Sequence, residues 1–93
     1  MNFPFDDIPN TAILTCYHIL EHNAPILHVS HDADDGMWQF LCGACHDEGD
    51  ARIVSLDYIY THDTTVAQLA HMPCGCAADR PHGDADWDIR STF

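Results

Sequence analysis

Two short runs of alternating apolar residues lie on either side of an acidic turn in the middle of this chain. The runs cover residues 26–30 and 37–41, and the turn between them ends in Asp35-Gly36. An Asp-Gly pair between two alternating runs is a strong local signal for a β-hairpin, because tight hairpin turns need residues that accept positive φ. The sequence therefore predicts an antiparallel pair of strands at its centre. We expect the core face of the second strand to carry Trp38, Phe40 and Cys42.

Three further segments are patterned like strands. Residues 11–20 are rich in β-branched and aromatic types and predict a strand over this whole stretch, in which Cys16 and His18 share one face. Shorter strands are expected at residues 52–55 and 76–80.

Two short helices are predicted between these last two strands. Apolar residues recur at i, i+3 and i+4 from Leu56, and Ser55 precedes them as an N-cap. A second helix is expected to begin after Asp63 or Thr64 and to end before Pro73. Its apolar residues are Val66 and Leu69.

These elements predict an α+β fold, with a small, mostly antiparallel sheet of four to five strands and two short helices late in the chain. A chain of 93 residues has room for one domain. We place that domain at residues 11–80, after an acidic lead-in at residues 1–10 and before a partly flexible acidic tail at residues 81–93.

The charge balance is strongly one-sided. Fifteen acidic residues face three basic ones, all of them arginines, and the net charge is −12. Such a surface repels phosphate backbones and anionic lipids, so we expect neither nucleic acid nor a membrane as partner. A basic protein partner is expected instead, because complementary charge speeds encounter. Trp87, between Asp86 and Asp88, is a candidate anchor for such a contact.

The sequence carries no recognisable targeting pattern. Its first residues lack positive charge, and its apolar stretches are far shorter than the ~20 residues of a membrane helix. We therefore expect a cytoplasmic protein whose five cysteines are reduced thiols rather than disulfides.

The sharpest motif is Cys42-Gly43-Ala44-Cys45-His46, which has the C-x-x-C-H spacing of c-type haem attachment. Under the haem hypothesis, Met72 is a candidate for the sixth iron ligand. The expected compartment and the β-patterned segment before the motif argue against haem.

Zinc is the alternative chemistry for the same motif. Cys42 and Cys45 are spaced like a zinc knuckle, in which one tight turn directs two thiolates at one ion. A second pair of ligands is needed, and the sequence offers two alternatives. They are Cys74 with Cys76, or Cys16 with His18.

An alternative interpretation of the cysteines needs no metal: Cys16 and Cys42 are small core residues, and the others are loop thiols. No nucleophile elbow or phosphate-binding loop occurs, and no pair of carboxylates has a distinguishing context. We therefore do not expect an enzyme.

One family resemblance covers about three quarters of the chain, from Ala12 to Arg80. It rests on Trp38-Gln39-Phe40 with Gly43, on Ile53-Val54-Ser55-Leu56 with Ile59, and on Asp63, Val66, Leu69, Pro73, Gly75 and Arg80. With this pattern the chain resembles the small bacterial domains described as immunity-protein-thirty-three-like, in particular a short branch with Trp-Gln-Phe-Leu-Cys-Gly at this place.

Membership would imply an antiparallel α+β domain that neutralises a toxin by binding it rather than by chemistry. No site residues carry over from the resemblance. The sequence thus predicts an acidic protein-binding module, with a zinc-stabilised domain as the alternative.

Overall fold

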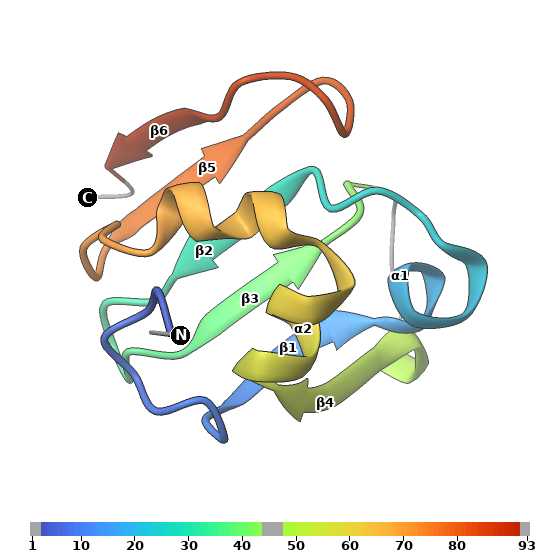
Figure 1. Ribbon diagram of the computed structural model, residues 1–93, viewed down its shortest axis with the longest axis horizontal. Coiled ribbons are helices and arrows are strands. Elements are labelled where there is room, and N and C mark those ends of the chain that lie inside the picture. Colours follow the sequence, from blue (N-terminus) through green and yellow to red (C-terminus); the bar gives the residue numbers. More distant parts are fainter. Residues whose placement is uncertain (1–2, 44–47, 92–93) are drawn as a thin grey trace.

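A computed structural model describes residues 3–43 and 48–91 of the chain. The fold is α+β, as predicted, and Figure 1 shows its sheet and short helices. In chain order the elements are β1 (Ala12–Cys16), α1 (Tyr17–His22), β2 (His28–His31), β3 (Trp38–Leu41), the 3-10 turn η1 (Glu48–Asp50), β4 (Ala51–Ser55), α2 (Leu56–His62), the 3-10 helix η2 (Thr64–Leu69), β5 (Cys76–Asp79) and β6 (Asp88–Ser91).

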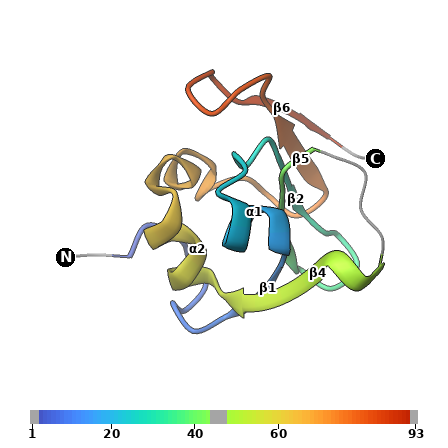
Figure 2. The ribbon, with the colours of Figure 1, turned by 90° about the vertical axis from the view of Figure 1, so that its right-hand side faces the viewer.

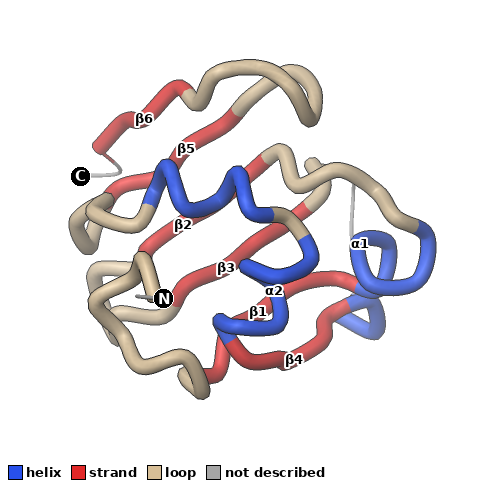
Figure 3. Tube along the Cα trace, in the orientation of Figure 1, coloured by secondary structure: helices blue, strands red, loops and turns tan. Residues whose placement is uncertain are grey.

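The sheet has six strands in the order β4-β1-β3-β2-β5-β6 (Figure 3). The expected sheet of four to five mostly antiparallel strands is therefore wrong: β1 runs parallel to β3 in the middle of a mixed sheet, with Leu14 opposite Gln39. Strand patterns in a sequence predict which segments extend, but they do not encode which strands become neighbours. Here β3 inserts between β1 and β2, the two strands that precede it in the chain.

The first strand is shorter than predicted. β1 ends at Cys16, and residues 17–22 turn into helix α1, which buries Ile19 against the core. Asn23 ends this helix in the left-handed conformation, at φ 53°, with its backbone N–H donating to the His18 carbonyl. The β propensity of this stretch is overridden because one helical turn buries Ile19.

The C-terminal segment holds a strand that the sequence pattern did not indicate. Residues 88–91 form β6, which pairs antiparallel with β5. All four of its residues are exposed, so no alternation of buried and exposed side chains marks the strand in the sequence.

Local predictions around the hairpin and the helix starts are confirmed. β2 and β3 pair antiparallel, and Trp38, Phe40 and Cys42 are all buried. The Ser55 side chain accepts a hydrogen bond from the Tyr58 backbone N–H at the start of α2. Asp63 caps η2 in the same way, accepting from the Thr65 backbone N–H.

Helices α2 and η2 lie on one face of the sheet, as the two perpendicular views show (Figures 1 and 2). The core fills the space between them and the strands, and its largest members include Trp38, Phe40, Ile13, Leu56 and Ile59. Among the described residues, no helix has the length and apolar character needed to cross a membrane.

One buried arginine joins the C-terminal half of the fold to this core. The Arg80 side chain is 1% exposed and donates to the Ile26 carbonyl at 2.9 Å, to Thr65 Oγ1 at 3.0 Å and to Asp63 Oδ2 at 3.1 Å. Its guanidinium also lies 4.0 Å from the centre of the Trp87 ring. The planar fork of this arginine, which directly follows β5, thus links the start of η2, the segment before β2 and the segment before β6.

We expect Arg80→Met to lower the free energy of unfolding by about 3 kcal/mol, because it leaves a carbonyl and a carboxylate without their buried donor. Arg90→Met is the matched control. Arg90 also pairs with a carboxylate, that of Asp79, but both side chains are about half exposed, so its loss should cost less than about 1 kcal/mol. Urea unfolding of both variants measures the difference, and equal losses would contradict the role given to Arg80.

Candidate metal site

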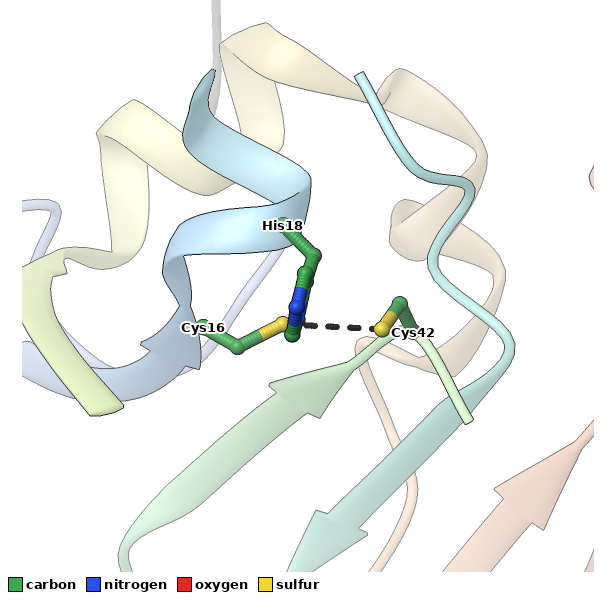
Figure 4. Close-up of side chains that lie close together, drawn as sticks. All are labelled: Cys16, His18 and Cys42. Atoms are coloured by element: carbon green, nitrogen blue, oxygen red, sulfur yellow. Dashed lines mark hydrogen bonds between the residues drawn. The ribbon is translucent and has the colours of Figure 1, made fainter. Parts of the chain in front are cut away.

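Three side chains with metal-binding atoms converge at one end of the sheet. The sulfurs of Cys16 and Cys42 and a ring nitrogen of His18 all lie within 4.8 Å of one another. Figure 4 shows the three side chains directed toward a common point from β1, α1 and the segment after β3.

The topology explains this convergence. β1 and β3 are parallel neighbours, so their carboxyl ends meet at the same edge of the sheet. Cys16 is the last residue of β1, and Cys42 follows the last residue of β3. His18 joins them because the chain turns into α1 directly after Cys16.

The two sulfurs are already spaced as a metal requires. The Cys16 thiol donates to Cys42 Sγ with a sulfur–sulfur distance of 3.7 Å. A tetrahedral zinc ion with Zn–S bonds of about 2.3 Å holds two thiolates about 3.8 Å apart. A disulfide bond of about 2.05 Å would need a much closer approach. The four described cysteines, Cys16, Cys42, Cys74 and Cys76, are all thiols.

The two sulfurs of the site are shielded from water, and His18 is half-buried. Cys16 is 1% exposed and Cys42 is 8% exposed. Burial raises the pKa of the Cys16 thiol above its ordinary value, and the neighbouring Cys42 side chain adds to that increase, whereas hydrogen bonds with the Ile19 and Cys42 backbone oppose it. Cys16 is therefore a neutral thiol near pH 7, and a metal ion has to displace its proton in order to bind.

The structure selects between the two predicted ligand pairs. Cys16 and His18 lie with Cys42, whereas Cys74 and Cys76 belong to the turn before β5 and to β5 itself, separated from β3 by β2. The prediction that Cys74 and Cys76 complete a site with Cys42 is not supported by this arrangement. Cys16 and His18 were expected on one strand face, but a helical turn brings them together instead.

Cys45 and His46, predicted as a zinc ligand and a haem ligand, lie outside the described residues. Met72, the candidate sixth ligand of the haem hypothesis, is 5% exposed and is part of the hydrophobic core.

Comparisons of this chain with family models, curated proteins and solved structures found no match. The resemblance to immunity-protein-thirty-three-like domains therefore stays a prediction, and the metal site is argued from its own geometry.

The raised pKa of the Cys16 thiol predicts how the stability of the metal-free protein changes with pH. The folded state holds this thiol proton more strongly than the unfolded state, so the stabilisation is complete below the ordinary pKa of 9.0 and is lost as the pH rises through the folded-state value. With a chelator present, the free energy of unfolding should fall as the pH rises above about 9, and Cys16→Ser should show a smaller fall. Parallel pH profiles for the two proteins would contradict this.

Proposed function

We propose that this chain is a small zinc-binding domain in which Cys16, His18 and Cys42 bind one zinc ion. The observation that supports the proposal is the convergence of two buried sulfurs and one imidazole within 4.8 Å, from three places in the chain. Ordinary core cysteines need no such arrangement.

The donor set favours zinc over hard cations. Thiolate sulfur and imidazole nitrogen suit zinc, whereas magnesium and calcium prefer oxygen ligands. No carboxylate belongs to the cluster formed by the described residues. Burial excludes water from the two sulfurs, which strengthens their attraction to a divalent cation.

The bound ion would have a structural role. It would tie the junction between β1 and α1 to the end of β3, where two neighbouring strands are otherwise joined through a short parallel ladder. A domain of this size has a small core, and a structural metal is a common way to supplement it.

Purified protein, prepared without chelator or acid, should contain about one equivalent of zinc by elemental analysis. Cys16→Ser, His18→Asn and Cys42→Ser should each lower that content, whereas Cys74→Ser and Cys76→Ser are matched cysteine controls that keep it. At a free zinc concentration of 100 times Kd, the metal should raise the free energy of unfolding by about 2.7 kcal/mol. Less than about a tenth of an equivalent, with no change of stability on adding zinc, would remove the proposal.

The fourth ligand is a separate question with its own variant. The sequence predicts Cys45, three residues after Cys42, and structural zinc sites are normally closed by four protein ligands. Cys45→Ser should therefore weaken zinc binding and reduce the visible absorption of the cobalt-substituted protein. Unchanged affinity would indicate a site with three protein ligands and one bound water.

A basic protein partner is the second candidate function, and a groove on α2 favours it. The groove, of about 480 Å³, is lined by Ser55, Asp57, Tyr58, Thr61 and His62. The Tyr58 side chain is 53% exposed beside an acidic residue, which combines an aromatic anchor with negative charge. A toxin is the partner class that the family resemblance implies.

This second function predicts binding that weakens with salt, because exposed charges are screened beyond about 10 Å at 0.1 M ionic strength. In a screen against basic proteins, Tyr58→Ala should weaken the interaction by about tenfold, as expected for an aromatic anchor. Tyr17→Ala, on α1, is the control. Binding insensitive to both salt and Tyr58 would count against this surface.

A further inference from the structure

A second cysteine–histidine pair lies at the opposite end of β3 from the metal site, since His31 pairs with Trp38 at the start of β3 and Cys42 follows its end. The Cys74 sulfur is 3.4 Å from Nε2 of His31, and Nδ1 of the same ring is 2.8 Å from the Met72 carbonyl oxygen. Cys74 is exposed in the turn before β5, and His31 is the last residue of β2.

These contacts decide which ring nitrogen of His31 carries the proton. A carbonyl oxygen can only accept, so Nδ1 must be the donor to Met72. In the neutral ring Nε2 then has a free lone pair, and this is the nitrogen that faces Cys74. The imidazole is thus arranged to accept the thiol proton of Cys74.

A neighbouring aromatic side chain also fixes the orientation of the His31 ring. It stacks on the Trp38 indole, with centroids 3.9 Å apart and an angle of 14° between the rings. Trp38 is itself held by a hydrogen bond from its indole nitrogen to Asp7 at 2.9 Å. Because the stacking on Trp38 and the hydrogen bond to Met72 both fix the imidazole, Nε2 stays directed at the Cys74 sulfur.

An acidic hollow of about 330 Å³ lies beside the His31 member of this pair. Its lining includes Ser30, His31, Asp32, Asp34, Asp35 and Cys76. Three carboxyl groups beside His31 favour a reagent with a positive charge over one with a negative charge.

We propose that Cys74 is a nucleophilic thiol that undergoes disulfide exchange with small cationic disulfides, with His31 as the base. The Cys74 sulfur attacks one sulfur of the disulfide while its proton passes to Nε2 of His31. A new S–S bond forms to Cys74, the old S–S bond breaks, and the departing thiolate takes up the proton. A thiol and a disulfide are thereby converted to a mixed disulfide and a thiol, with no other oxidant or reductant.

The reactive pair is independent of the zinc site. Cys16 and Cys42 are buried and Cys74 is exposed, so a reagent in solution reaches Cys74 more readily than the two zinc-site sulfurs, with or without metal.

Cystamine is the probe, and mass spectrometry of the protein as purified identifies the modified residue. We expect Cys74 to react first, at a rate about tenfold above that of cysteines in the urea-unfolded chain, since an ordinary thiol is only a few per cent thiolate at pH 7. Cys74→Ser should abolish the fast phase, and Cys76→Ser should keep it. His31→Asn, whose amide can still donate toward Met72, should slow the reaction about tenfold.

Charge selectivity is tested with bis(2-hydroxyethyl) disulfide as the neutral reagent. Cystamine should react faster with the native protein, and Asp34→Asn combined with Asp35→Asn should reduce that preference. Asp57→Asn combined with Asp84→Asn removes two exposed acids elsewhere and is the control. Modification of another cysteine first, or a Cys74 rate equal to that of the unfolded chain and unchanged in His31→Asn, would overturn the proposal.

Discussion

The parallel pairing of β1 with β3 is the constraint on which the arrangement of this molecule depends. Parallel strands point their carboxyl ends the same way, so residues at these two ends become neighbours. Cys16 ends β1 and Cys42 follows β3, and they meet although they are 26 positions apart. An antiparallel pairing of the same strands would have sent these thiols to opposite edges of the sheet. The proposed zinc site is thus a consequence of strand order.

A second long-range contact secures the other half of the fold. Arg80, which follows the four-residue strand β5, donates to groups on two separate segments, and its guanidinium lies over the Trp87 ring. A chain with three basic residues has buried one of them, and the geometry explains why an arginine is suited to this position. A guanidinium donates from three separate nitrogens and so reaches a carbonyl, a hydroxyl and a carboxylate that lie apart, whereas the three donors of an ammonium group all leave one nitrogen.

The two cysteine–histidine clusters differ in their surroundings, and this difference separates their proposed chemistry. Around Cys16 and Cys42 the protein excludes water, so the neutral thiol is favoured until a cation replaces its proton. Cys74 is exposed and faces a single imidazole beside a group of carboxylates. The first environment suits a bound ion, and the second suits a reagent that arrives from solution.

Features that depend on near neighbours follow from the sequence: the hairpin around Gly36, the core face of β3, and the caps provided by Ser55 and Asp63. The sequence also supplied both pairs of candidate ligands for Cys42, but it could not choose between them. Long-range packing, in contrast, places β3 beside β1, begins α1 at Tyr17 and adds β6 to the edge of the sheet. The physical reason is that capping and alternation act over a few residues, whereas strand order follows from how the whole chain buries its apolar surface at once.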